Sequence, residues 1–536
     1  MKKYLLSLFT FIIPIVTFAQ EATEKGIDQR IDEAFKPFSD LISNIIFFEV
    51  FDGAPFVIIL LVGSALFFSI YFGFPNFRYF LTSINIVRGK YDDIDHHESG
   101  SPELAIDGDI KGTIEDESKE GEVTHFQALA TAVSGTVGNG NIAGVALAIA
   151  LGGPGATFWM IVCGLLGMST KFVECTLGVQ YRDVDNEGTV YGGPMYYISR
   201  GLKEKGFVML GKIAAVLFAI FCIGGSFGGG NAAQSNQATI VIKDLLGIES
   251  TSAGAIIGIV LAILVGVIII GGIKRIASVT EKVVPFMAIL YLVACLYIIL
   301  SNFSFIDDAF GLILSEAFNP KAIGVGGVIG VLLVGFKRAA FSNEAGAGSA
   351  SIAHSAVKTK YSASEGLVAL LEPFIDTVVI CTMTALVIII FNFSGAFEYG
   401  LNEINPGQVL IDGQYYEGAG ITSKAFAQYI PYSGVFLTIA VVLFAVSTMI
   451  SWSYYGLQSW KFLFGRGKAA DLTYKLLFLL FVVIGAAASM NSIWAFSDAM
   501  IFAMVFPNMI GLYFLFPVVK KQLRRYLDAI KTHKEA

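Results

Sequence analysis

Ser134-Gly-Thr-Val-Gly138-Asn139-Gly140-Asn141-Ile-Ala-Gly144 interrupts a segment that is otherwise apolar enough to cross a membrane. Glycine and asparagine are poor helix formers. In hydrocarbon, unwound backbone is tolerated only where protein buries it or where it lines a watery cavity. We therefore expect a helix that breaks halfway through the membrane and presents main-chain amides and carbonyls there. Breaks of this kind hold a zwitterion and a cation side by side in transporters.

The composition is that of a polytopic membrane protein. Of 536 residues, 55% are hydrophobic and only 15% are charged, whereas a soluble chain of this length needs far more polar surface. The net charge is −7 and the basic residues fall in short clusters, so we expect no nucleic-acid partner. No cysteine pair has CxxC spacing, which argues against a disulfide scaffold and a zinc site. We find neither a nucleophile–base constellation nor an ATP-binding loop, so an enzyme or an ATP-driven pump is disfavoured and no cofactor is expected.

The first residues are typical of a secretory signal peptide. A basic start at Lys2 and Lys3 precedes a short apolar core, and small residues end at Ala19. The alternative is an additional, uncleaved span. A cleaved signal over residues 1–19 places the mature N-terminus outside the cytoplasm and implies the bacterial inner membrane.

Eleven apolar segments follow, each close to the length that crosses a bilayer. They lie near residues 54–75, 126–150, 155–179, 208–242, 254–273, 283–302, 321–350, 364–391, 433–457, 472–490 and 494–519. The predicted fold class is therefore an all-α polytopic membrane protein with eleven transmembrane helices, which we call spans one to eleven.

The basic residues predict the orientation of these spans. If the chain starts outside, most lysines and arginines between spans fall in the cytoplasmic loops, as the positive-inside rule requires. The N-terminus is then outside and the C-terminus cytoplasmic. The chain divides into a signal peptide (1–19), a periplasmic N-terminal segment (20–53), an extra helix (54–75), a cytoplasmic acidic loop (76–125), a first repeat (126–302), a periplasmic loop (303–320), a second repeat (321–519, with a periplasmic loop at 392–432) and a cytoplasmic tail (520–536).

The two repeats are predicted from the positions of two interruptions. The first lies in span two, and glycine-rich stretches from Gly324 to Gly330 and from Gly335 to Gly348 make span seven the second candidate. Interrupted segments at corresponding positions of two halves indicate a repeat with a shared central site. Spans 2–6 and 7–11 then form a 5+5 inverted repeat. Close helix packing is the alternative explanation for glycines such as Gly326 and Gly330.

Four motifs resemble the alanine/glycine:cation symporter family. They are Gly138-Asn-Gly-Asn-Ile-Ala-Gly144 with Gly152-Gly-Pro-Gly-Ala156, Glu281-Lys-Val-Val-Pro-Phe-Met287, Phe341-Ser-Asn-Glu-Ala-Gly-Ala-Gly-Ser349, and Leu371-Glu-Pro-Phe-Ile-Asp-Thr377. The resemblance implies a LeuT-like architecture. It places a small neutral amino acid (alanine or glycine) and Na⁺ as coupling ion between spans two, four, seven and nine.

The candidate site residues come from these four spans. The expected substrate-binding residues are Gly138, Asn139, Gly140, Asn231, Gln234, Gly335, Phe336, Thr448 and Trp452. The expected sodium ligands are Ser134, Thr136, Val137, Asn141, Phe444, Ser447 and Thr448, because a hard cation prefers oxygen. In span two, free amides suit a substrate carboxylate.

Several alternatives stay open at this point. Asn231 also suits an interhelical hydrogen bond, and serine or threonine in a membrane helix usually bonds its own backbone. Lys171 and Glu174 are spaced to form an ion pair. Glu372 and Asp376 lie on one helix face, which leaves proton coupling open. Besides a sodium-coupled symporter, the function alternatives are a proton-coupled symporter, an ion channel and a non-transporting amino-acid sensor.

Overall fold

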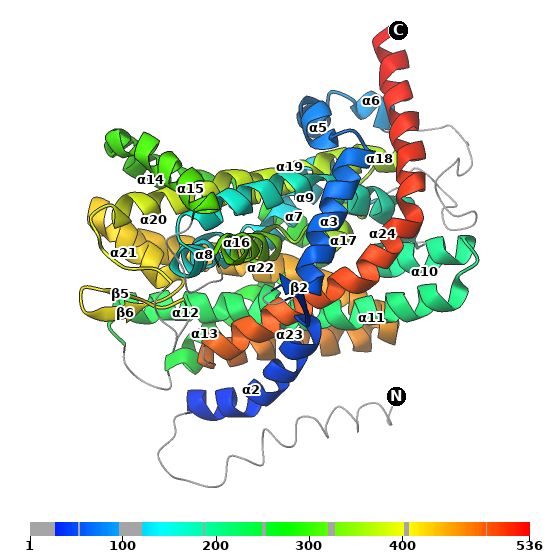
Figure 1. The fold of residues 1–536 in the computed structure, drawn as a ribbon. Helices are drawn as coiled ribbons and strands as arrows, with labels where there is room; N and C mark the ends of the chain where they lie inside the picture. The colour runs from blue at the N-terminus through cyan, green and yellow to red at the C-terminus, as the bar shows by residue number, and fades with distance from the viewer. Residues whose placement is uncertain are drawn as a thin grey trace.

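The computed structural model describes residues 27–51, 54–95, 121–185, 188–248, 253–319, 327–400, 407–488 and 490–535, and these are mostly helical (Figure 1). The predicted signal peptide, residues 1–19, lies outside the described residues. Residues 27–95 contain five helices. They are α2 (Ile27–Ile46), α3 (Phe56–Tyr71), α4 (Pro75–Arg78), α5 (Phe80–Val87) and α6 (Asp92–Asp95).

Residues 125–318 form the helices of the predicted first repeat and two helices beyond it, η5 and α15. These are α7 (His125–Thr136), η3 (Gly140–Gly144), α8 (Val145–Gly152), α9 (Gly155–Gln180), α10 (Pro194–Glu204), α11 (Val208–Phe227), η4 (Gly228–Ala232), α12 (Ala233–Leu246), α13 (Ala253–Ile269), α14 (Gly272–Ser301), η5 (Phe303–Phe305) and α15 (Ile306–Phe318).

Residues 327–535 form the rest of the molecule. The helices are α16 (Gly327–Asn343), α17 (Ala350–His354), α18 (Ser362–Ala369), α19 (Leu371–Pro373), η7 (Phe374–Cys381), α20 (Thr382–Asn392), α21 (Ala419–Tyr429), α22 (Ser433–Phe464), α23 (Lys468–Ala487) and α24 (Met490–Glu535). Three small antiparallel pairs of strands lie between helices: β1 (Glu49–Phe51) with β2 (Ala54–Pro55), β3 (Asp183–Val184) with β4 (Val190–Tyr191), and β5 (Val409–Ile411) with β6 (Gln414–Tyr416).

The helices support a multi-pass membrane protein. Within the described residues, 7 helices are long and apolar enough to cross a membrane, or up to 8 with one bent pair counted as a span. α3 and α13 are apolar but shorter. A helix lies on each of the eleven predicted segments, but the count of eleven spans stays a prediction. α10, α15 and α21 are additional helices that hydropathy did not separate from the loops.

The break in span two is confirmed. α7 ends at Thr136, η3 begins at Gly140, and the two halves of the span are bent by 50°. α7 itself begins at a capping box, in which the side chains of Thr124 and Gln127 each accept a hydrogen bond from the other's backbone amide. The helix therefore has a defined start and stops where glycine and asparagine replace good helix formers.

The interruption in span seven lies later than Gly335. α16 runs unbroken to Asn343, and the chain then turns before α17 begins at Ala350. Left-handed backbone at Glu344 (φ 54°), Gly346 (φ 96°) and Gly348 (φ 87°) makes this turn. The break therefore falls at the end of the second predicted stretch, Gly335 to Gly348. Gly335 itself lies within α16, where the absence of a side chain allows close packing. A Cβ there would lie 2.5 Å from the Ala156 carbonyl oxygen of α9.

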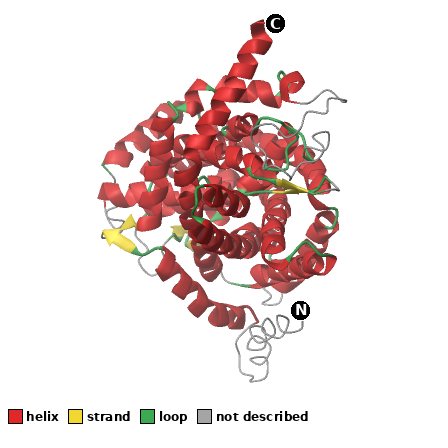
Figure 2. Ribbon diagram, turned by 90° about the vertical axis from the view of Figure 1, so that its right-hand side faces the viewer, coloured by secondary structure: helices red, strands yellow, loops and turns green. Residues whose placement is uncertain are grey.

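The described chain is a bundle made mostly of helices, with a few short strands (Figure 2). α9 is largely buried in it, and the outer helices expose apolar side chains. α9 packs against α16 and α18, and most of its side chains are buried. The outward faces of α13 and α14 carry large exposed apolar side chains, among them Ile256, Ile263, Val267, Ile289 and Val293. Such faces suit lipid, since a soluble protein rarely exposes a continuous apolar surface.

Candidate functional site

The span-two break is fastened to span four by one glutamine. The Asn139 amide donates to Gln234 Oε1 at 3.1 Å, and Asn139 Nδ2 donates to the Gln234 carbonyl at 3.2 Å. Gln234 Nε2 in turn donates to the Gly229 carbonyl at 2.9 Å, within the π-turn η4. Because a π-turn changes the backbone pairing of a helix, this carbonyl is available to a side chain. The structure thus brings Asn139 and Gln234, two of the candidate substrate residues, into contact.

Gly138 lies where spans two, four and nine converge. A Cβ at this position would lie 2.5 Å from Thr448 Oγ1 and 3.2 Å from Gln234 Oε1. Only glycine allows the three spans to approach this closely. Gly140 faces span seven instead, where the nearest described atoms are those of Ser342 and Phe341.

Asn141 connects the same break to spans seven and eight. Its Oδ1 accepts from the Gly138 amide at 2.8 Å, and its Nδ2 donates to Asp376 Oδ1 at 2.6 Å and to the Asp376 carbonyl at 3.1 Å. Asp376 Oδ2 accepts from Ser342 at 2.9 Å and from Thr377 at 2.6 Å. Three spans therefore surround one fully buried carboxylate.

A second group of oxygens joins spans two and nine. Ser134 Oγ donates to the Ser447 carbonyl at 2.7 Å, and Thr448 Oγ1 donates to the Ser134 carbonyl at 3.0 Å. Ser447 Oγ donates to the Phe444 carbonyl at 2.9 Å. Four of the predicted sodium ligands are thus within one network of hydroxyls and carbonyls, the donor set that suits a hard cation.

The remaining predicted cation ligands of span two lie at the end of α7. Thr136 Oγ1 donates to the Ala132 and Val133 carbonyls, at 3.3 Å each, so its hydroxyl bonds its own helix. Val137 follows α7 and its amide still donates to the Val133 carbonyl at 2.7 Å. In the part of the chain that the structure describes, neither residue is hydrogen-bonded to span nine.

The other predicted substrate residues take part in helix packing. Asn231 Nδ2 donates to the Phe478 carbonyl of α23 at 2.6 Å, which is the interhelical bond left open above. Trp452 Nε1 donates to Glu344 Oε1 at 3.1 Å, and its ring fills the space beside Gly230. Phe336 packs edge-on against Trp159 of α9, with ring centroids 5.8 Å apart.

The buried charged residues have other partners than the sequence predicts. Lys171 Nζ lies 3.0 Å from Glu372 Oε1, whereas Glu174 accepts from Asn508 at 2.7 Å. Glu372 and Asp376 therefore have separate partners, although they share a helix face. Sequence reasoning missed Asp376 as a partner of the break, and its one signal was an acidic residue within an apolar segment.

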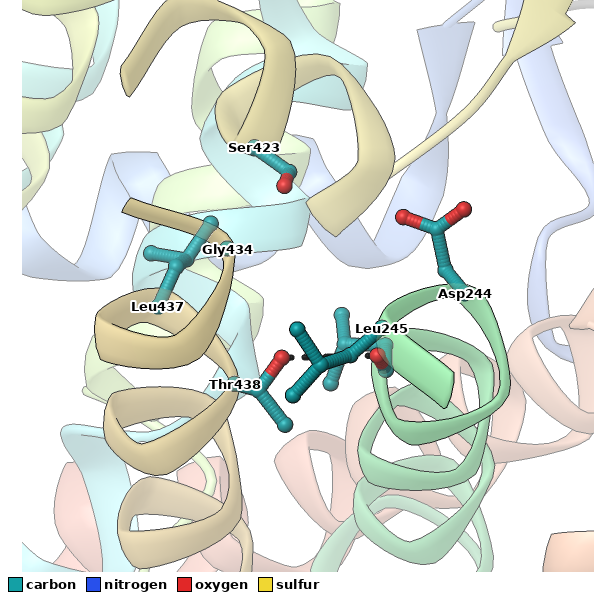
Figure 3. Close-up of a pocket in the computed structure, with 7 residues that line it drawn as sticks. Asp244, Leu245, Ser423, Gly434, Leu437 and Thr438 are labelled. Atoms are coloured by element: carbon teal, nitrogen blue, oxygen red, sulfur yellow. Dashed lines mark hydrogen bonds between the residues drawn. The ribbon is translucent and has the colours of Figure 1, made fainter. Parts of the chain in front are cut away.

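A small pocket lies between the ends of α12, α21 and α22 (Figure 3). Asp244, Ser423 and Thr438 are among its lining residues, and Thr438 Oγ1 donates to the Val241 carbonyl at 3.4 Å. Val241 lies two turns beyond Gln234, on the same face of span four. By the predicted orientation, the pocket is on the periplasmic side of the break.

Comparisons with known proteins identify the family. The model of the sodium:alanine symporter family matches residues 39–536. The chain belongs to this family.

Its relatives and structural neighbours are transporters. The chain is 38% identical over 493 residues to the sodium/alanine symporter AgcS of Methanococcus maripaludis, covering 92% of this chain and 98% of that one. It is 32% identical over 426 residues to the sodium/proton-dependent alanine carrier protein of Bacillus sp. PS3, covering 78% and 91%. The crystal structure of MhsT with L-phenylalanine matches with a TM-score of 0.49 at 14% identity, over 75% of this chain and 99% of that one. Because the chain belongs to the sodium:alanine symporter family and these relatives are transporters, it is a multi-pass, cation-coupled amino-acid symporter and not an enzyme.

Proposed function

We propose that this protein is a sodium-coupled symporter that imports a small neutral amino acid, alanine or glycine, by alternating access. The observation that carries the proposal is the broken span two, whose Gly138–Gly140 segment is contacted by Gln234 and Thr448. The name of AgcS, a sodium/alanine symporter, supports the same substrate and ion.

The substrate carboxylate would bind at the amides of the break. In this structure the Asn139 amide donates to Gln234 Oε1. This neutral oxygen therefore occupies the position in which a substrate carboxylate oxygen would accept the same hydrogen bond. An anionic oxygen forms a stronger hydrogen bond with a backbone amide than a neutral one. Substrate binding would therefore displace Gln234 Oε1 and leave its amide group free to turn toward the ligand.

The coupling sodium would lie in the network of Ser134, Phe444, Ser447 and Thr448. Three of its oxygens are the main-chain carbonyls of Ser134, Phe444 and Ser447, and the hydroxyls can rotate to present their lone pairs. Because the network joins spans two and nine, a cation there would hold the broken helix against α22. Sodium binding would in this way order the amide site for the amino acid.

The alternating access of the central site to the two sides of the membrane would follow from an inverted repeat. Span two begins one half and span seven the other, and both are broken near their middle or end. We propose that spans 2–6 and 7–11 rock about this centre, with span one outside the repeat. The N-terminus would be outside and the C-terminus in the cytoplasm of a cell with an inner membrane.

Radiolabelled uptake into proteoliposomes tests this function. Alanine and glycine should enter saturably when an inward sodium gradient is present, and replacement of sodium by choline should abolish uptake. Membrane potential adds a driving force of about 2.3 kcal/mol per charge per 100 mV, so a negative interior should accelerate uptake. Ion current without amino acid would support a channel instead, and amino-acid binding without flux would support a sensor.

Proton coupling is the second candidate, and a specific observation favours it. Asp376 is fully buried between spans two, seven and eight, and a buried carboxylate is a natural carrier of a proton. The Bacillus sp. PS3 relative is named for both sodium and proton dependence. Uptake driven by a proton gradient in the absence of sodium would establish this alternative.

A further inference from the structure

A buried carboxylate joins the ends of the two broken spans. Glu365, in the first turn of α18, contacts His125 Nδ1 through Oε2 and lies 2.5 Å from His354 Nδ1 through Oε1. His125 begins α7 and His354 ends α17. All three side chains are buried. One carboxylate thus links the start of α7, the first half of span two, to the end of α17, the helix that follows the break in span seven.

Both ring nitrogens of His354 face carboxylates. Nδ1 faces Glu365, and Nε2 lies 3.6 Å from Glu372 Oε2. A neutral imidazole has one nitrogen without a proton, and that lone pair would point at a carboxylate oxygen. The imidazolium cation has a donor on each nitrogen and attracts both oxygens. His354 therefore suits the protonated form in this conformation.

The charge balance around His354 also favours a bound proton. Lys171 lies 3.0 Å from Glu372 and balances its charge, whereas Glu365 lies between the imidazoles of His125 and His354. A buried carboxylate without a cation beside it is costly, so a proton on one of these imidazoles stabilises this arrangement. Within the described residues, the surrounding elements also carry other titratable or charged groups. They are Glu174 and Cys175 on α9, Tyr197 on α10, Glu344 after α16, Asp376 on η7 and Tyr455 on α22, with Glu122, Arg182, Lys358, Lys360 and Arg525 at the end of the bundle where His125 lies.

The same end of the bundle is closed by main-chain bonds. Val123 and Val357 form an isolated parallel bridge, the Glu122 amide donates to the Ala356 carbonyl at 2.7 Å, and the Lys358 amide donates to the Val123 carbonyl at 2.8 Å. By the proposed orientation this is the cytoplasmic end. Release of substrate into the cell would require these contacts and the Glu365 link to separate.

We propose that His354 is a proton-binding site, and that a cytoplasmic proton bound there holds the inner halves of the two broken spans together. The proposal rests on the proposed function for its orientation. When the inner end opens, the imidazole becomes hydrated and titrates near its ordinary value of about 6.5. Proton binding then favours the closed inner end. Below about pH 6.5 both the closed and the open form carry the proton, so the fraction of molecules open at the inner end does not change with pH. Above about pH 6.5 only the closed form keeps the proton, and the open fraction rises by up to about tenfold per pH unit.

This proton enters and leaves on the same side. It therefore regulates release according to cytoplasmic pH and does not cross the membrane. A proton gradient without sodium should consequently drive no uptake through this site.

The test measures opening directly. Val123 is 2% exposed in this closed arrangement, so Val123→Cys reacts with a hydrophilic maleimide only when the inner end opens. The full-length chain carries this substitution with its five native cysteines replaced by alanine. The alkylation rate is measured from pH 5.5 to 8.5 and divided by the rate in the same chain with His354→Gln, which cancels the pH dependence of thiol reactivity.

We expect this ratio to be flat below about pH 6.5 and to rise by up to about tenfold per pH unit above it. Glu316→Gln changes a buried carboxylate on α15, bonded to Tyr399, and should leave the profile unchanged. If His354→Gln does not fold, Glu365→Gln replaces it as the reference, since this substitution keeps the size of the side chain and removes the negative charge beside His354. A ratio that does not vary with pH would overturn the proton site.

Transport in the same preparation separates the two proposals. Sodium-driven alanine uptake with a pH-independent ratio would reject the proton site and leave the symporter intact. A pH-dependent ratio without sodium-driven uptake would reject the proposed function and leave the proton site. Uptake driven by a pH gradient alone, and lost in His354→Gln, would overturn the assignment of entry and exit to one side.

Discussion

At the scale of single residues, the local chemistry of the break was predictable but its partners were not. Gly138, Asn139 and Asn141 stand out because they are polar or flexible within an apolar segment. Asn141 bonds Asp376, which is 235 residues away in sequence, and nothing local specifies that contact. The same holds for Lys171, which the sequence pairs with Glu174 and the fold pairs with Glu372.

Asn141→Leu should abolish sodium-dependent uptake while leaving folded protein. Leucine removes the acceptor of the Gly138 amide and the donor to Asp376, and each buried polar group without a partner costs about 1–3 kcal/mol. Uptake of alanine with and without sodium measures the effect. Asn302→Leu is the matched control, because the Asn302 side chain donates to the Ile298 carbonyl in the last turn of α14 at 2.8 Å, away from the break. Normal uptake by Asn141→Leu would remove Asn141 from the proposed site.

Trp452→Ala should widen selectivity toward bulkier amino acids. The indole ring lies against Gly230 of η4, so its removal would leave space next to the proposed substrate position. The ratio of leucine to alanine uptake is expected to rise. Trp452→Phe keeps most of the ring volume but removes the donor to Glu344, and should preserve the selectivity for small substrates. An unchanged substrate range in Trp452→Ala would count against a place for this ring in the pocket.

At the scale of elements, composition located the break in span two to a few residues, and the break in span seven only to the stretch from Gly335 to Gly348. α7 ends just before two asparagines within a glycine-rich run. Asparagine favours local hydrogen bonds that compete with a helix, and glycine loses the most backbone entropy in one. In span seven several glycines occur before the true break, and Gly335 serves close packing against α9. Sequence spacing alone does not separate a packing glycine from a turn glycine such as Gly346, since only the fold fixes the sign of φ.

Gly138→Ala should inactivate transport, whereas Gly144→Ala should not. Both glycines belong to the interrupted segment and neither has a positive φ. An alanine Cβ at position 138 would lie 2.5 Å from Thr448 Oγ1, and at position 144 it meets no described atom within 4 Å. The first substitution must therefore move span two away from span nine. Alanine uptake of the two variants at equal protein amounts checks this, and equal activity would contradict the close approach at Gly138.

Lys171→Met should destabilise the protein strongly. The substitution leaves Glu372 in the buried core without its partner at 3.0 Å, and breaking a buried ion pair from one side costs about 3–5 kcal/mol. We expect a clear fall in the thermal unfolding midpoint in detergent. Lys36→Met removes an exposed pair with Asp40 on α2 and should change the midpoint little, because exposed pairs contribute little. Equal midpoints for both variants would show that Glu372 is not charged without Lys171.

At the scale of the whole molecule, the orientation is a prediction that labelling can decide. The five native cysteines are buried, so an introduced surface cysteine is the main target of a membrane-impermeant maleimide. Tyr415 of β6 is 66% exposed and lies in the segment predicted to be periplasmic, and Lys468 at the start of α23 is exposed in a loop predicted to be cytoplasmic. In intact spheroplasts Tyr415→Cys should be labelled at once, and Lys468→Cys only after permeabilisation. The reverse pattern would place the C-terminus outside and would move the proposed proton site to the other face of the membrane, because His354 and Lys468 lie on the same predicted side.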